Sequence, residues 1–133
     1  MKTILNYSLS CLLLLAMFSC SEPKKVIWLD ELDLSVMKTG WGVPQINKSF
    51  RETPLLIGNQ KYSRGVGTAA TSSLLINVNG KGKTLHTIVG VDDCSDERGS
   101  VNFYILGDKK ILWESGLMKK GNSAKVADLD INM

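Results

Sequence analysis

Neighbouring carboxylates are the residues of this sequence best suited to binding chemistry. Asp92 and Asp93 follow an apolar stretch that ends at Val91, and Asp96 and Glu97 come soon after them. Carboxylate oxygens coordinate hard cations such as Ca²⁺ and accept hydrogen bonds from sugar hydroxyls. Acidic runs of this kind are also common as solvated surface. The residues therefore predict either an oxygen-donor ligand site or an acidic surface loop.

Three tryptophans and one arginine are further candidates for contacts with a ligand. The C–H face of a sugar packs on an aromatic ring while the indole N–H stays free to donate a hydrogen bond. Trp41 stands between two glycines in a predicted loop, whereas Trp28 and Trp113 lie in apolar strand patterns and are predicted to belong to the core. Arg64 offers a fork of donors to sugar hydroxyls, or it pairs with a neighbouring acid. Trp41 is thus the preferred stacking platform.

The sequence argues against three other kinds of chemistry. A phosphate-binding loop needs a glycine five residues before its Gly-Lys-Thr motif, and Asn77 occupies that position before Gly82–Thr84. Glycoside hydrolysis needs two carboxyl groups about 5 to 9 Å apart beside a deep sugar site, and a domain of this size gives Glu31 and Asp33 no second layer to build one. The formal net charge of +3 is spread without a basic run, which argues against nucleic acid as a partner.

The N-terminal segment has the features of an export signal. After Lys2, the apolar run Leu12–Phe18 is too short for a permanent membrane helix and is typical of a signal-peptide core. A small residue precedes Cys20, as in the lipobox of bacterial lipoproteins, which this segment resembles. We therefore expect residues 1–19 to be a lipoprotein signal peptide, with cleavage after Ala16 or Ser19 without lipidation as the alternative.

The cysteines agree with a lipid anchor. Cys11 leaves with the signal, Cys20 becomes the acylated N-terminus, and Cys94 has no partner for an intramolecular disulfide. Residues 20–25 form a short polar tether, and residues 26–133 form one domain that its core must hold together. We expect an exported protein anchored by lipid to a bacterial membrane, in the periplasm or on the cell surface.

Hydropathy alternation defines the fold class. A period of two predicts strands at 74–78, 85–91, 101–105 and 127–131. Between the strands lie turn signals, which are Gly58–Asn59, Asn79–Gly80, Gly107–Asp108 and Gly121–Asn122. After residue 25 no segment keeps an apolar helical period for three turns. The pattern predicts an all-β sandwich, either immunoglobulin-like or a jelly roll.

Four motifs in a fixed order give the chain a family resemblance. The segments "VIWLDELDLSVMKTGWG", "PLLIGNQKYSRGVGTAATS", "VGVDD" and "GSVNFYILGDKKILWESGLMK" resemble the NPCBM domain, a carbohydrate-binding module found on glycoside hydrolases. From Val26 to Ile131, the chain is similar to the versions of this domain that precede the catalytic domain of secreted bacterial alpha-galactosidases. The resemblance implies a galactose-binding-like β-sandwich of jelly-roll type that holds sugar at its loops and often carries a structural Ca²⁺ ion.

The chain departs from the family pattern at two places. The family continues Gly-Thr-His-Ala where this chain has Ala69 in place of the histidine. The family also continues into an Asp-Gly-Asp-Gly segment beyond the point at which this sequence stops. We therefore expect the jelly roll to be incomplete at its C-terminus, with its last strands missing and with Ala127, Leu129 and Ile131 partly uncovered. Residues 21–133 alone should then be oligomeric or partly unfolded.

The resulting hypothesis is a non-catalytic carbohydrate-binding module on an exported lipoprotein. It would bind galactose-type glycans, either galactosides or plant or host glycans, as the N-terminal portion of an alpha-galactosidase-like glycoside hydrolase. The residues assigned to carbohydrate binding are Trp41, Arg64, Asp92 and Asp93, with Cys20 for lipidation and no metal ligands assigned. The alternative is a structural or interaction β-sandwich that has lost sugar binding, and Ala69 motivates it.

Overall fold

The computed structural model describes residues 23–132 of the chain. Cys20 and the predicted signal peptide lie outside the described residues. The described part contains short 3-10 helices and strands in the order η1 Leu29–Glu31, η2 Leu34–Val36, β1 Gln45–Ile46, β2 Leu55–Ile57, β3 Gln60–Tyr62, β4 Val66–Gly67, β5 Thr84–Val89, β6 Ser100–Gly107, β7 Lys110–Lys119 and β8 Lys125–Asp130. None of the helices in residues 23–132 is long and apolar enough to cross a membrane.

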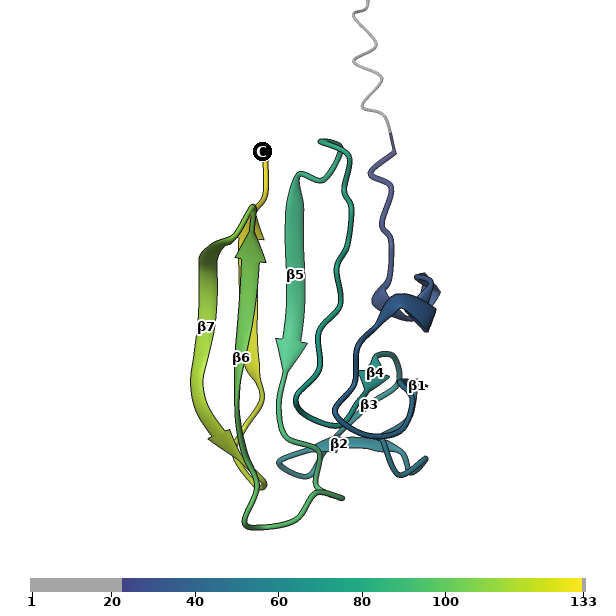
Figure 1. Cartoon of the computed structure of the whole chain (residues 1–133), viewed down its shortest axis with the longest axis vertical. Coiled ribbons are helices and arrows are strands. Elements are labelled where there is room, and N and C mark those ends of the chain that lie inside the picture. The colour runs from purple at the N-terminus through teal and green to yellow at the C-terminus, as the bar shows by residue number, and fades with distance from the viewer. Residues whose placement is uncertain (1–22, 133) are drawn as a thin grey trace, which may run out of the picture.

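The strands form antiparallel pairs. β1 pairs with β4, β2 with β3, β5 with β8, and β6 with β7. The long strands β5 to β8 lie along one side of the molecule, and the short strands lie on the other side with η1 and η2 (Figure 1). β7 also contacts β8. This arrangement is a β-sandwich, and it confirms the predicted fold class.

Alternation along the strands decides which side chains face the interior, because successive side chains of a strand point to opposite faces. In β6, Val101, Phe103 and Ile105 are half-buried and the residues between them are exposed. Met118 of β7 and Ala127 of β8 are each only 1% exposed. The period of two read from these segments is therefore confirmed, and it gives β6, β7 and β8 an interior face that contributes to the core.

Tight turns connect the hairpins at the positions that the sequence indicates. Gly58 and Asn59 have φ angles of 56° and 66° between β2 and β3, and Asp108 and Lys109 have 46° and 70° between β6 and β7. Two consecutive residues with positive φ make a type I′ turn, whose twist matches that of the flanking strands. The second turn lies within the turn predicted at residues 107–109.

Two expectations about local structure are wrong. Segment 74–78 alternates as a strand would, but it has no strand partner, and Leu75 is 89% exposed. Trp28 was expected in the core, but it precedes η1 and is 48% exposed. Alternation indicates a strand only if a partner strand covers one face, and neither segment has such a partner.

The outward face of β6 and β7 carries exposed apolar side chains. Leu106 and Ile111 are cross-strand neighbours and are 60% and 61% exposed, and Leu117 is 66% exposed. The expectation that Ala127 would lose its cover is wrong, since it is buried, and Leu129 is half-buried. The outside of the β6–β7 hairpin is therefore one region with uncovered apolar side chains, while Ala127 of β8 is covered and Leu129 and Ile131 are half-buried.

Candidate functional site

Trp41 is presented to solvent by a loop that backbone contacts hold in place. Its side chain is 69% exposed. The neighbouring Gly40 N–H donates a hydrogen bond to the Ala69 carbonyl at 3.1 Å. A Cβ atom at position 40 would lie 2.2 Å from the carbonyl oxygen of Ala70, so a side chain there would force the two loops apart. The backbone next to Trp41 is therefore held in place, although the Trp41 ring itself is largely exposed.

Phe50 and Arg51 extend the surface that begins at Trp41. The rings of Trp41 and Phe50 meet edge to face, with centroids 6.4 Å apart and planes at 84°. The Arg51 guanidinium lies over the Phe50 ring, with Cζ 5.1 Å from its centroid. Both geometries are those of favourable aromatic and cation–π contacts. The result is a row of an exposed indole, a phenyl ring and a cation.

A buried serine shapes the turn that carries Phe50 and Arg51. Ser49 is completely buried, and its Oγ accepts hydrogen bonds from the backbone N–H groups of Arg51 and Thr53, each at 3.2 Å. The hydroxyls of Ser49 and Thr53 also share a hydrogen bond at 2.7 Å. Buried hydroxyls that are fully bonded fix a backbone firmly. Our sequence analysis missed this turn, although one aromatic followed by an arginine in a polar loop is a usable signal.

Asp92 and Asp93 bind the backbone of the β2–β3 hairpin. Asp92 Oδ2 accepts the Leu56 N–H at 3.0 Å, and Asp92 Oδ1 accepts the Cys94 N–H at 2.9 Å. The two oxygens of Asp93 accept the N–H groups of the Gly58–Asn59 turn at 3.1 and 2.7 Å. Every carboxylate oxygen of the pair thus has a backbone donor, and the pair holds the hairpin to the end of β5.

Gly90 allows β5 to approach the hairpin closely enough for these bonds. A Cβ atom at position 90 would lie 2.4 Å from Cγ2 of Ile57 in β2. Such a contact is too short for any real Cβ atom, so a larger residue would displace Ile57. The close approach also lets the Asp93 N–H donate to the Leu56 carbonyl at 2.8 Å. The glycine before the two aspartates is therefore a packing requirement of this junction.

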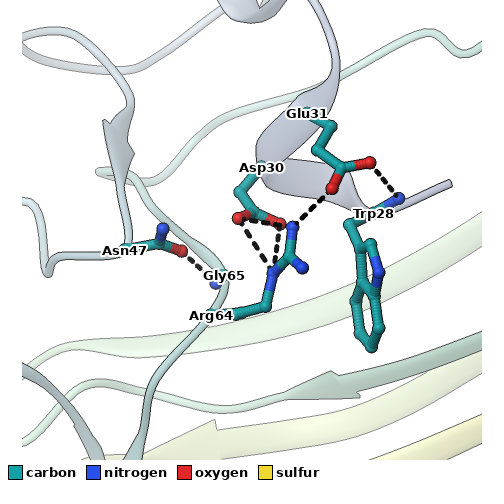
Figure 2. A network of polar contacts seen from close by, with 6 residues as sticks. All are labelled: Trp28, Asp30, Glu31, Asn47, Arg64 and Gly65. Atoms are coloured by element: carbon teal, nitrogen blue, oxygen red, sulfur yellow. Dashed lines mark hydrogen bonds and ion pairs between the residues drawn. The ribbon is translucent and has the colours of Figure 1, made fainter.

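The Arg64 side chain contacts two acids and a tryptophan of the N-terminal segment (Figure 2). Its Nε donates to both carboxylate oxygens of Asp30, at 3.1 and 3.2 Å, and its Nη2 donates to Glu31 Oε1 at 2.8 Å. Its Cζ lies 4.5 Å from the centroid of the Trp28 ring. The hydrogen bond from Arg64 is the main cause of the lowered pKa of Asp30. The cluster ties η1 to the β3–β4 connection.

Asn47 supports the same connection from the other side. Its Oδ1 accepts the Gly65 N–H at 2.9 Å, and its own N–H donates to the Gly65 carbonyl at 2.8 Å. Figure 2 shows this pair next to the Arg64 cluster. The chain around Arg64 is therefore held both by side-chain ion pairs and by reciprocal bonds to the backbone of Gly65.

Replacement of Arg64 by alanine should lower the stability of the domain in a way that depends on pH. Asp30 has a pKa below its ordinary 3.8 because Arg64 bonds its carboxylate, so the pair stabilises the folded state above that pH and loses its effect as the pH falls through the lowered value. In thermal unfolding we expect a midpoint a few degrees lower than that of the original protein at pH 7, and a shrinking difference below about pH 4. Arg98→Ala, which removes an exposed pair, is the control. A difference that stays constant with pH would assign the effect to packing on Trp28 instead.

The described residues do not offer a ready set of metal ligands. Within residues 23–132 no group of three His, Cys, Asp or Glu side chains is arranged to hold a metal ion. Asp92 and Asp93 already accept backbone hydrogen bonds with all their oxygens. Burial raises the pKa of the Cys94 thiol, which disfavours the thiolate that binds metals. The Ca²⁺ ion that the resemblance implies stays a prediction, and we derive no property of the site from it.

The structure distributes the predicted binding residues over three places. Trp41 lies beside Phe50, Asp92 and Asp93 follow β5 and bond the β2–β3 hairpin, and Arg64 lies between β3 and β4 and bonds the acids of η1. Of these four side chains, only Trp41 is mostly exposed and makes no hydrogen bond or ion pair within residues 23–132 that a ligand would have to displace. The assignment of all four to ligand contacts stays a prediction, and Trp41 is the residue best placed to fulfil it.

Comparison with known proteins identifies the family. The NPCBM/NEW2 domain family matches residues 25–133. The chain belongs to this family. The match extends over every strand and loop described above, so the predicted family resemblance is confirmed.

Solved structures similar to this NPCBM/NEW2 domain are carbohydrate-binding modules. A CBM51 module of Clostridium perfringens GH95, in complex with methyl-galactose, has a TM-score of 0.67 and 28% sequence identity, and the match covers 79% of this chain and 78% of that one. A second C. perfringens structure, CBM51-2 in complex with GlcNAc with the INT domains of ZmpB, has a TM-score of 0.69 at 22% identity, over 78% of this chain and 24% of that one. The second likeness supports the fold alone.

Similar curated proteins are much longer than this domain. Alpha-1,3-galactosidase B of Akkermansia muciniphila is 40% identical over 86 residues, which are 63% of this chain and 11% of that enzyme. A second relative, from Renibacterium salmoninarum, is 29% identical over 117 residues, and the chain spans 8% of its length. The NPCBM/NEW2 domain thus corresponds to a small part of these proteins.

Proposed function

We propose that this NPCBM/NEW2 domain binds galactose-type glycans without catalysing a reaction, and that Trp41 is its stacking platform. The exposed Trp41 ring on its braced loop is the observation that carries the proposal. A largely uncovered indole offers apolar area, and a ligand that covers this area gains binding free energy. The C–H face of a galactoside is such a cover. The methyl-galactose complex of the similar CBM51 module supports the choice of sugar.

The surroundings of four acidic residues argue against a hydrolytic role for them. A glycosidase needs one carboxyl group that donates a proton and a second that attacks or activates water. Asp30 and Glu31 are bonded to Arg64, and Asp92 and Asp93 to backbone N–H groups. We propose that hydrolysis belongs to a catalytic domain of a longer parent glycoside hydrolase of alpha-galactosidase type, to which this module delivers substrate.

Calorimetric titration with galactosides tests the proposal. The protein is titrated with methyl-galactoside and with the matching glucoside, which differs at one hydroxyl. Selective heat of binding for the galactoside supports the proposal. Absence of binding to either sugar would favour the second candidate function, an interaction domain without sugar affinity. The alanine at position 69, which faces the Trp41 loop through its carbonyl, is the feature that favours that candidate.

We also propose that the mature chain begins at a lipidated Cys20. The apolar run and the small residue before the cysteine support this anchor. When the full chain is produced in a bacterial host, we expect it in the membrane fraction and Cys20→Ala in the soluble fraction. Cys94→Ala, which changes a cysteine inside the domain, is the matched control and should stay with the membranes. A Cys20→Ala protein that remains membrane-bound to the same extent would refute the anchor.

A further inference from the structure

Arg51 is a cation held in position beside the proposed sugar platform. Its guanidinium stacks on Phe50, and Phe50 contacts Trp41 edge to face. The residue is exposed, and among residues 23–132 no carboxylate forms an ion pair with it. Its backbone N–H is fixed by the buried Ser49 hydroxyl. Arg51 therefore has a defined direction and free donors.

Arg51 is one of three cations that act on the same carboxylate. Asp96 is the acid that approaches from the neighbouring loop, and the Arg98 backbone N–H and guanidinium bind it at 2.9 and 3.3 Å. The positive charges of Arg51 and Lys120 add to the effect of Arg98 in lowering the pKa of Asp96. Glu52, next in sequence to Arg51, lines a separate depression with Lys48 and Lys61. Asp96 is thus already paired with Arg98, and the ion pairs of residues 23–132 do not include Arg51.

An arginine stacked on an aromatic ring is well suited to an anionic oxygen group. The stacking covers one face of the guanidinium and leaves its edge N–H groups for two parallel hydrogen bonds to a sulfate or carboxylate. The guanidinium lies 5.1 Å from the Phe50 centroid, and that centroid lies 6.4 Å from the Trp41 ring, so both groups are within reach of one glycan chain. A sugar stacked on Trp41 therefore brings its own substituents, or the next residue of the glycan, to Arg51.

We propose that Arg51 forms a subsite for an anionic substituent, a sulfate ester or the carboxylate of a sialyl residue, on the galactoside that Trp41 holds. This inference rests on the proposed function and narrows its ligand class to acidic galactose-type glycans. The shared chemistry is a planar or tetrahedral oxyanion that accepts two hydrogen bonds from the guanidinium edge. Sulfated and sialylated glycans both supply it.

Lactose and two of its acidic derivatives test the subsite. The protein is titrated by calorimetry with lactose, lactose 3′-sulfate and 3′-sialyllactose, at about 20 mM and about 300 mM NaCl. We expect at least one acidic sugar to bind about fivefold more tightly than lactose at low salt, because an exposed but oriented ion pair contributes about that factor. The preference should shrink at high salt. The acidic sugar that shows it identifies the source of the oxyanion.

Substitutions then assign the preference to Arg51. In Arg51→Gln the ratio of affinities for the acidic sugar and for lactose should fall to about one, whereas Lys61→Gln, a charge change in the separate depression, should leave the ratio as it is. Equal affinity of the original protein for lactose and for both acidic sugars would overturn the subsite while leaving the proposed function intact. A preference that survives in Arg51→Gln would also overturn it. No binding of any of the three sugars would overturn the subsite and the proposed function together.

Discussion

Trp41→Ala will weaken galactoside binding by about 30-fold or more, because removal of a central aromatic contact typically costs about 2 kcal/mol of binding free energy. The indole ring is 69% exposed and touches Phe50 only edge to face. The substitution therefore removes ligand contact area and leaves the fold largely unchanged. Calorimetry with methyl-galactoside gives the affinity, and thermal unfolding should give nearly the same midpoint for both proteins.

Two further variants make this result specific. Trp41→Phe keeps a smaller aromatic face and should retain part of the affinity. Tyr104→Ala removes another exposed aromatic side chain, on the outward face of β6, and should leave the affinity unchanged. If Trp41→Ala binds as tightly as the original protein, the sugar does not stack on this ring.

Substitutions of Asp92 and Asp93, unlike Trp41→Ala, should have a large effect on the stability of the fold. Asp93→Ala leaves the N–H groups of Gly58 and Asn59 without their acceptors, and Asp92→Ala does the same to the N–H groups of Leu56 and Cys94. Loss of an acceptor for a partly buried donor costs about 1 to 3 kcal/mol. We expect each variant to lower the free energy of unfolding by about 2 kcal/mol, measured by urea denaturation.

The control for this experiment is the exposed acid of the same loop. Glu97→Ala should change the free energy of unfolding by less than about 0.5 kcal/mol, as surface substitutions usually do. A variant of Asp92 or Asp93 that unfolds like the original protein but binds galactoside much more weakly would contradict the structural role. It would support the ligand role predicted from the sequence.

The strands that sequence patterns predicted correctly are those with a partner in this structure. The alternation in 85–91, 101–105 and 127–131 corresponds to β5, β6 and β8, and each of these strands is paired. Segment 74–78 alternates equally well but remains unpaired. Alternation reports only which face of an extended segment is apolar. Whether another strand covers that face is decided by the rest of the chain.

Polar side chains were harder to predict because their partners are distant in the sequence. Arg64 binds acids 33 and 34 residues before it, and Asp92 binds an amide 36 residues before it. Hydropathy and spacing describe neighbours along the chain, so they cannot tell which of several acids an arginine meets. Sequence reasoning left Arg64 open between sugar and acid, and the fold places it with Asp30 and Glu31.

The sequence by itself determined the all-β class, the positions of the hairpin turns and the exposure of Trp41. Each of these depends on short-range chemistry, which is the period of two, glycine and asparagine at positive φ, and glycines on both sides of an aromatic residue. The tertiary structure alone decided that the aspartates hold a hairpin and that Phe50 and Arg51 lie beside Trp41. These arrangements follow from the approach of loops separated along the chain, and that approach exists only once the sandwich has formed.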